Sequence, residues 1–299
     1  MSLKQKPNPI KCHCCDDGCY KSFSDIVNDK EIISDKVYIH AIKSHIPNFN
    51  EAIEDSYMCL NAACKHIYRN YRDDIISHHV DDYRDHQWSK ETKSLDMGSE
   101  EKIKLRSARF KNILHMIETH VDKDSDVLEI ASGRGYFLLL VKNYFKSITG
   151  MDIDPKTKIH NETINPEVPY IVSDFLEMDE DKQYDVIFAL DVLEHIENIQ
   201  DFPKKISKLA KKVVVQVPTD RPIVPPNVHL MHPKPEYKTT DGSLLSVEFD
   251  GHLHYFTEFS LNNLFTKDNI FKCSFLYKSK AGELAGGPEI LAVYEKIGD

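Results

Sequence analysis

The feature that most constrains the fold is an alternation of short apolar runs and helical patterns in the second half of the chain. Runs rich in β-branched or apolar residues lie at 126–130, 148–152, 169–173, 184–190 and 212–217. Helical patterns at 135–145 and 198–212 separate some of these runs, and an amphipathic pattern at 99–121 precedes them. Strands that alternate with helices are typical of a parallel sheet covered on both faces. The sequence therefore predicts an α/β fold with a Rossmann-like, doubly wound sheet.

The end of the chain predicts two further strands of a different kind. A helix is expected to begin at 260–265, and apolar runs follow at 272–278 and 289–295. The link between these two runs is short and rich in glycine, which suits an antiparallel pair because a parallel crossover needs a dozen or more residues. We therefore expect a seven-stranded, mainly parallel sheet with a C-terminal antiparallel hairpin.

The first third of the chain differs in amino-acid composition from the rest. Residues 1–97 hold six of the seven cysteines and no long apolar run, and the stretch that ends them, "KETKSLDMGS", reads as a linker. We expect a small cysteine-rich domain at 1–97 and the sheet domain at 98–299. An odd number of cysteines argues against a disulfide framework, and no secretory signal or membrane-spanning run is evident. The expected location is the cytoplasm.

The cysteines of the first domain have the spacing of a structural zinc site. Such a site uses two short-spaced pairs of thiolates placed tetrahedrally. Cys12 and Cys15 form one pair and Cys59 and Cys64 the other, so we expect a small zinc-knuckle domain. The segment Cys14-x4-Cys19 is a competing first pair. The alternative is a set of cysteines that bind no metal. Their free thiols would be open to oxidation without contributing to the structure.

A bare turn follows the first strand in "DVLEIASGRGYF" (126–137). Gly133 and Gly135 would let the backbone approach a ligand where a β-carbon would collide. A lone GxG is equally typical of an ordinary strand–helix turn. Because Leu138 stands where a dinucleotide motif has its third glycine, the sequence argues against a dinucleotide site.

Acidic residues lie at the ends of four successive strands: Glu129, Asp152, Asp174 and Asp191. Ligands of open parallel sheets bind beyond the carboxyl ends of the strands, and Asp152 is about 20 residues after the glycine turn, where a carboxylate accepts ribose hydroxyls. Each acid alone is also explained as a solvated strand end or a helix cap. As a set buried at one edge they would repel each other unless ligand donors satisfied them, so the set predicts a ligand.

These segments together resemble the class I S-adenosylmethionine-dependent methyltransferases over residues 105–295. "VLEIASGRGYF", "ITGMDIDP", "IVSDFLEM", "YDVIFALDVLEHIENIQDF" and "VVVQVPT" are similar to successive motifs of that family, and "GHLHYFTEFSLNNLF" to a segment before its final helix. The resemblance implies that S-adenosylmethionine is the cofactor. Its methionine part would lie by the glycine turn, its ribose on Asp152, and its adenine against Ile153, Asp174 and Phe175. The full cofactor-binding set is Glu129, Ala131, Ser132, Gly133, Gly135, Asp152, Ile153, Asp174, Phe175 and Asp191. Ala131 stands where the family pattern has its first glycine, which could weaken cofactor affinity.

Three histidines are candidates for the base that deprotonates an oxygen or carbon nucleophile. His195 follows the fourth strand, and His252 and His254 alternate, so in an extended segment both would face one side. A histidine in "LEH" is equally explained by packing in the core. A divalent metal on Asp191, Glu194 and His195 with His252 or His254 is a further alternative. The "D-V-L-E-H" string is similar to the "E-x-x-E-H" ligands of small-RNA and some ubiquinone-pathway O-methyltransferases. Because Asp replaces the first Glu and "LEH" is common without a metal, we expect no catalytic divalent metal.

The predicted function is transfer of a methyl group to an oxygen or carbon of a small molecule. "YMCLNAACKHIYRN" is similar to a zinc knuckle of the deoxysugar methyltransferases, which suggests a sugar or nucleotide-sugar as acceptor. One alternative is an RNA methyltransferase, and the net charge of −10 disfavours a nucleic-acid partner. Another is a non-catalytic protein that binds S-adenosylmethionine. The pattern predicts no particular oligomeric state and no membrane partner.

Overall fold

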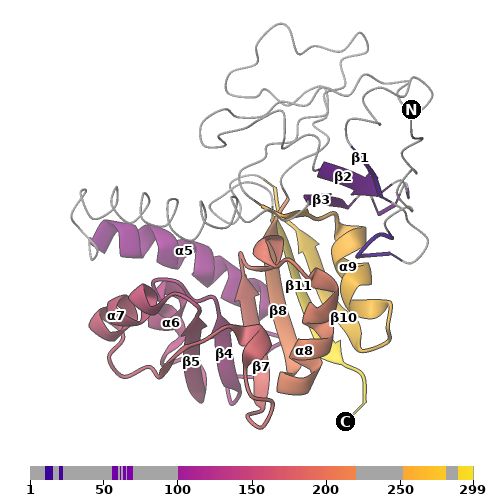
Figure 1. Ribbon diagram of the computed structural model, residues 1–299. Coiled ribbons are helices and arrows are strands. Elements are labelled where there is room, and N and C mark those ends of the chain that lie inside the picture. The colour runs from indigo at the N-terminus through magenta and orange to yellow at the C-terminus, as the bar shows by residue number, and fades with distance from the viewer. Residues whose placement is uncertain are drawn as a thin grey trace, which may run out of the picture.

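A computed structural model of the chain describes residues 11–15, 20–22, 56–59, 61, 63–64, 66–69, 100–219, 252–280 and 289–298. Within these ranges the strands form one large sheet and one small sheet (Figure 1). The large sheet is built from the second half of the chain, and the small one lies beside its β8/β11 end, next to helix α9. Helices line both faces of the large sheet.

The large sheet has the predicted seven strands, and their order places the first of them near the middle. The order is β10-β11-β8-β7-β4-β5-β6. The strands are β4 (Asp126–Ile130), β5 (Ser147–Asp152), β6 (Tyr170–Val172), β7 (Tyr184–Leu190), β8 (Ala210–Pro218), β10 (Phe271–Lys278) and β11 (Glu289–Lys296). The first five are parallel, and β11 is antiparallel to both β8 and β10. The predicted parallel sheet and C-terminal hairpin are therefore confirmed.

Helices cover both faces because the central strands are apolar on both sides. In β7, Val186 and Phe188 pack into one core, whereas Ile187 and Ala189 pack into the other. The first core is closed by α5 (Glu100–Ile117) and α6 (Tyr136–Val141), and the second by α8 (Phe202–Leu209) and α9 (Glu258–Thr266). Among the helices of the described residues, none is long and apolar enough to cross a membrane.

The helix expected over 198–212 is shorter than predicted. It consists of a 3-10 turn, η4 (Ile199–Asp201), and α8, and the chain passes directly into β8 at Ala210. The two lysines 211 and 212 extend the helical pattern in the sequence. In the fold they belong to β8, because the valines that follow them alternate between the two cores and draw this segment into the sheet.

The chain reverses its direction of travel along the sheet beside β4. From β4 it passes through α6, β5, α7 (Pro155–Ile164) and β6 on one side, then crosses to β7 and β8 on the other. Two 3-10 turns, η2 (Phe175–Glu177) and η3 (Leu193–His195), follow β6 and β7. Open parallel sheets bind ligands at such a switch point, at the carboxyl ends of the strands.

The small sheet draws its strands from both ends of the chain. Its order is β1 (Tyr20–Ser22), β2 (Ser56–Cys59), β3 (Ile67–Arg69) and β9 (His254–Tyr255), all antiparallel. β9 comes from the segment just before α9. The domain boundary at 97/98 stays a prediction. The fourth strand of the small sheet, β9, comes from the second predicted domain, so this sheet contains residues from both sides of the boundary.

Candidate functional site

The turn between β4 and α6 takes its shape from three residues in the left-handed region. Ala131, Gly133 and Gly135 have φ values of 49°, 51° and 70°. A β-carbon on Gly135 would lie 2.2 Å from Asn161 Oδ1, whereas one on Gly133 would meet nothing within 4 Å. Gly135 is therefore required by packing inside the protein, and Gly133 faces open space, as a residue beside a ligand would.

Three consecutive carbonyl groups of this turn are held by side chains of α7 and β6. The Tyr170 hydroxyl donates to Gly133 O at 3.2 Å. His160 Nδ1 lies 3.1 Å from Arg134 O, and Asn165 Nδ2 donates to Gly135 O at 2.9 Å. We call Tyr170, His160 and Asn165 the loop clamp. It fixes the orientation of each peptide plane in the turn before any ligand binds.

The predicted acids at the strand ends are brought to one edge, and protein groups satisfy most of them. Asp152 is 5% exposed and accepts from the amides of Gly133 (3.0 Å) and Asp154 (2.9 Å). Asp174 caps η2 by accepting from Leu176 N at 2.9 Å. The expectation that all four acids need ligand donors is therefore wrong, because backbone amides at a turn or a helix start can supply donors instead.

Glu129 is the acid that differs. It is 4% exposed, and its Oε2 has no hydrogen-bond partner among the residues that the structure describes. Burial, together with the nearby Asp152 carboxylate, raises the pKa of Glu129 well above its usual range. A buried acceptor without a donor is costly in a folded protein, so Glu129 is the strand-end acid whose environment most suits a ligand donor.

Asp191 is bound to an arginine that the sequence analysis did not single out. Arg109 of α5 donates to both Asp191 oxygens, at 2.6 and 2.9 Å, and to Gln216 Oε1 at 2.7 Å. Its guanidinium also lies 3.2 Å from Glu289. Asp191 itself has a φ of 56°. This bidentate ion pair joins α5 to the end of β7. It engages both oxygens of Asp191, which a metal ion would need as ligands.

Two of the three candidate base residues lie together past the end of β7. The rings of His195, in η3, and His252 are 4.8 Å apart. With the carboxylate of Glu194 they place three potential ligand atoms within 4.8 Å of one another. His195 is exposed and Glu194 is buried. These residues form a polar group beside the carboxyl end of β7, next to the strand-end acids.

His254 does not join this group, and the expectation that it faces the same side as His252 is wrong. The alternation of an extended strand does not reach His252, because β9 begins at His254 and the chain bends at Leu253. His254 is 1% exposed, and its Nε2 lies 2.7 Å from Ile196 O. Burial lowers the pKa of His254 well below its usual range.

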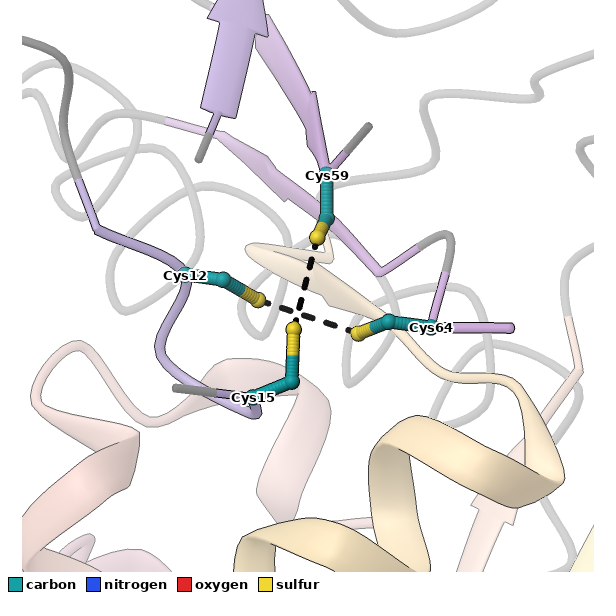
Figure 2. Close-up of side chains that lie close together, drawn as sticks. All are labelled: Cys12, Cys15, Cys59 and Cys64. Atoms are coloured by element: carbon teal, nitrogen blue, oxygen red, sulfur yellow. Dashed lines mark hydrogen bonds between the residues drawn. The ribbon is translucent and has the colours of Figure 1, made fainter. Parts of the chain in front are cut away.

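The four predicted cysteine ligands are gathered in a separate centre, away from the strand ends. Figure 2 shows Cys12, Cys15, Cys59 and Cys64 pointing toward a common point. The Cys12 and Cys64 sulfurs are 3.8 Å apart, those of Cys15 and Cys59 are 3.6 Å apart, and all four are buried. We call these four residues the cysteine centre.

The competing first pair, Cys14 and Cys19, is not supported as the ligand set. Cys14 is buried, but its sulfur is not one of the four that gather, and its amide donates instead to Cys12 Sγ at 3.4 Å. Cys19 lies outside the described residues. Of the cysteines that the structure describes, those with the predicted Cys12/Cys15 and Cys59/Cys64 spacing therefore converge.

The sequence profile of a family described as "Methyltransferase domain" matches residues 102–270, more than half of the chain. The chain belongs to this methyltransferase family. The methyltransferase is S-adenosylmethionine-dependent. At the carboxyl ends of the strands, which we call the rim, Gly133 faces open space and Glu129 presents a buried oxygen without a partner among the described residues.

Curated relatives of the methyltransferase are O-methyltransferases. It is 30% identical over 115 residues to a ubiquinone biosynthesis O-methyltransferase of Rickettsia bellii, covering 36% of this chain and 48% of the relative. A protein of the same name from Rickettsia typhi is 27% identical over 106 residues, covering 33% of this chain and 43% of the relative. The chain thus spans about half the length of the curated relatives it matches.

Solved structures of similar fold include methyltransferases from bacteria. The N-methyltransferase NodS of Bradyrhizobium japonicum, solved with S-adenosyl-L-homocysteine, has a TM-score of 0.45 and 11% identity over 70% of this chain and 98% of its own. An S-adenosylmethionine-dependent methyltransferase of Clostridium acetobutylicum has a TM-score of 0.45 and 13% identity over 64% of this chain and 92% of its own. Scores at this level add nothing to the family assignment.

Arg109 of the methyltransferase could have been found from its position in the amphipathic pattern. It stands four residues before Ile113, on the stripe that the apolar residues of α5 turn toward the sheet. A cation on a buried stripe needs a buried anion as partner. That signal points to a paired acid, although it does not say which one.

Proposed function

We propose that the methyltransferase transfers a methyl group to an oxygen or carbon nucleophile of a small molecule, with His195 as the base that receives the acceptor's proton. The observation that carries this proposal is the pair of imidazoles, His195 and His252, beside the carboxyl end of β7. An imidazole that titrates near neutral pH is suited to take a proton from a bound hydroxyl.

In this proposal, different side chains of the site bind the cofactor and act on the acceptor. S-adenosylmethionine supplies a methyl group already activated by a positively charged sulfur. Asp152, Glu129 and the clamped turn would hold the nucleoside and methionine parts, as the family resemblance implies. His195 would orient the acceptor and receive its proton, and alignment of this kind is worth several orders of magnitude in rate.

The acceptor class that we favour is a hydroxyl compound of low molecular weight. The curated relatives are named O-methyltransferases, which supports oxygen as the methylated atom. The cysteine-rich segment resembles the zinc knuckle of deoxysugar methyltransferases, which supports a sugar or nucleotide-sugar. The net charge of −10 weighs against RNA.

The test is a methyl-transfer assay with methyl-labelled S-adenosylmethionine and three probes: a catechol such as 3,4-dihydroxybenzoate, a dTDP-linked keto sugar, and total RNA. We expect label in one of the two small molecules. His195→Ala should lower turnover by about 100-fold or more, the usual contribution of a positioned base, without weakening S-adenosylhomocysteine binding. Label in RNA alone, or an unchanged rate in His195→Ala, would contradict the proposal.

A divalent cation held by Glu194, His195 and His252 is a second candidate for this group. Two imidazoles and one carboxylate are a ligand set that divalent transition metals accept, and the three atoms lie within 4.8 Å of one another. Asp191 would not take part, because Arg109 uses both of its oxygens. Dialysis against EDTA separates the two roles: the base predicts a turnover that survives dialysis, and the metal predicts a loss that added Mg²⁺, Mn²⁺ or Zn²⁺ restores.

For the cysteine centre we propose a structural zinc ion. Four thiolates at about 2.3 Å from a tetrahedral zinc ion have sulfurs about 3.8 Å apart. The Cys12–Cys64 and Cys15–Cys59 sulfur–sulfur distances, 3.8 and 3.6 Å, match that geometry. Cysteine thiolates are also the preferred ligands of structural zinc.

Metal analysis of two cysteine variants tests this zinc site. The purified wild-type protein should contain one zinc per chain, and Cys64→Ala should lose it. Cys14→Ala is the matched control, because Cys14 is equally buried but its sulfur lies outside the centre. It should keep the zinc. Wild-type protein without zinc, or equal loss in both variants, would contradict the proposal.

A further inference from the structure

The two-residue strand β9 connects the cysteine centre with the histidine pair. On one side it pairs with β3, where Ile67 opposes Tyr255 and Tyr68 opposes His254. β3 begins three residues after Cys64. On the other side, the amide of Leu253 donates to Glu194 O at 2.7 Å. Glu194 and His195 belong to the same turn, η3. The segment 253–255 therefore contacts both the strand that follows Cys64 and the turn that carries His195.

The side chain of His254 fills the space between these two contacts. Its Nε2 lies 2.7 Å from Ile196 O, at the end of the turn, and because a carbonyl only accepts, Nε2 carries the proton. Its ring stacks on His66 at 5.3 Å and on Tyr68 at 5.3 Å, both in the β2–β3 hairpin that carries Cys59 and Cys64. At 1% exposure the His254 side chain is shielded from solvent.

Side chains along α9, from its N-cap Thr257 to its C-cap Lys267, also join this segment to the cysteine centre. Thr257 Oγ1 donates to Cys64 O at 2.7 Å, and Asn263 Nδ2 donates to Cys14 O at 2.5 Å. The Lys267 ammonium donates to His13 O at 3.0 Å. Backbone carbonyls of both cysteine segments are therefore bound by the helix that follows β9. The order of the cysteine segments and the position of β9 depend on each other.

The cofactor half of the site has a separate support. The loop clamp holds the glycine turn from α7 and β6, and Asp152 is held by amides of its own turn and of the glycine turn. The hydrogen bonds named here join residues of the glycine turn, α7, β5 and β6, whereas those of β9 join it to β3 and to the η3 turn. The two halves of the site can therefore respond differently when the cysteine centre opens.

We propose that His254 is a positioning residue: it transmits the assembly of the cysteine centre to the η3 turn, so that His195 is held against His252 only while the centre is intact. The inference rests on the proposed function in one respect, the role of His195 on the acceptor side. Opening of the centre removes the partner of β9 and the rings that His254 stacks on. The η3 turn, which holds His195 on the acceptor side of the site, then becomes more mobile. The glycine turn and Asp152, on the cofactor side, keep their order.

Hydrogen exchange and S-adenosylhomocysteine titration, applied to the full chain, test this coupling. His254→Phe keeps a ring for the stack and removes the bond to Ile196 O. It should speed exchange of the 193–196 amides about tenfold, the effect of one buried hydrogen bond, and leave the dissociation constant of S-adenosylhomocysteine within about twofold. His254→Gln, whose amide can donate to the same carbonyl, should restore part of the protection. His115→Phe, on an exposed histidine of α5, is the control and should change neither quantity.

The second arm opens the cysteine centre by zinc chelation, or by Cys64→Ala if the purified protein holds no zinc. In the wild type, exchange at 193–196 should rise together with that at 56–59 and 66–69, while 126–152 stays protected. In His254→Phe the same treatment should add little at 193–196, because the connection is already cut. Unchanged exchange at 193–196, or equal loss of protection at 126–152, would overturn the coupling. If the protein holds no zinc but opening the centre still raises exchange at 193–196 and leaves 126–152 protected, only the zinc proposal is contradicted.

Discussion

In the turn after β4, Ala131 occupies the left-handed region with a φ of 49°. An L-residue with a β-carbon pays about 1–2 kcal/mol for this conformation, which glycine adopts freely. The side chain of Ala131 is exposed and gains little packing in return. The family pattern has glycine at this position, so the alanine is a local cost at the edge of the cofactor site.

Replacing Ala131 with glycine should therefore stabilise the protein. We expect Ala131→Gly to raise the free energy of unfolding by up to about 1 kcal/mol, after the extra entropy of glycine in the unfolded chain is subtracted. Ala131→Val, which is β-branched, should lower it. Urea unfolding of the three proteins measures both changes. Equal stability of all three would show that the turn is not strained.

Glu289, at the start of β11, is the second residue with an unusual environment. Burial raises its pKa to about 7, although the Arg109 guanidinium opposes the shift. Its ordinary value is 4.5. Because the folded state binds the proton more tightly than the unfolded state, this group stabilises the fold fully below about pH 4.5, and that contribution is lost as the pH rises to about 7.

Glu289→Gln removes this dependence and isolates it. The free energy of unfolding of the wild type minus that of Glu289→Gln should fall by up to about 3 kcal/mol between pH 4.5 and 8, since one pKa unit corresponds to about 1.4 kcal/mol. Urea unfolding at several pH values gives this difference. A difference that stays constant or rises with pH would mean that Glu289 is ionised throughout.

At the scale of elements, α7 is the support of the cofactor turn. Asn165, at the end of α7, is fully buried and donates both to Gly135 O and to Asn161 Oδ1, each at 2.9 Å. Asp154 begins the same helix by accepting from Lys156 N. Both ends of α7 are thus fixed, and through the loop clamp it fixes the turn between β4 and α6.

Loss of the Asn165 side chain should weaken the cofactor site more than a comparable loss elsewhere on α7. We expect Asn165→Ala to raise the dissociation constant of S-adenosylhomocysteine about tenfold, because Gly135 O loses its side-chain donor and keeps only the amide of Leu139, so the peptide plane is held less firmly. Thr163→Ala is the control, since its hydroxyl donates to Ile159 O on the exposed side of the same helix. Calorimetric titration measures both. A similar affinity in both variants would contradict the role of the clamp.

The sequence was sufficient to predict the seven strands and their directions because β4, β7, β8 and β11 are apolar and buried on both faces, and the lengths of the links between the runs indicate how the strands pair. It was not sufficient for β9. A strand of two residues has no periodicity of its own, and its pairing with β3 joins residues far apart in the chain. For the same reason, simple alternation put His254 with His252, whereas the bend at Leu253 separates them. Asp191 was identified as a site residue, but its partner Arg109 was not.

At the scale of the whole molecule, two separately supported regions meet around η3. The rim of strand ends, with Glu129, Asp152 and the clamped turn, belongs to the large sheet. The cysteine centre and the small sheet are joined to the η3 turn through β9. In our proposal the rim binds the cofactor, and the cysteine centre determines whether the acceptor side of the site is formed.

The central claim is that the rim at the carboxyl ends of β4 and β5 binds the cofactor through Asp152. Calorimetric titration of the full chain with S-adenosylhomocysteine, beside Asp152→Asn and the control Asp154→Asn, tests it most directly. We predict one site per chain in the wild type, little change in Asp154→Asn, and an affinity about 100-fold weaker in Asp152→Asn, since asparagine offers the ribose hydroxyls one acceptor oxygen in place of two and no negative charge. Absence of binding in the wild type, or equal affinity in Asp152→Asn, would contradict the claim.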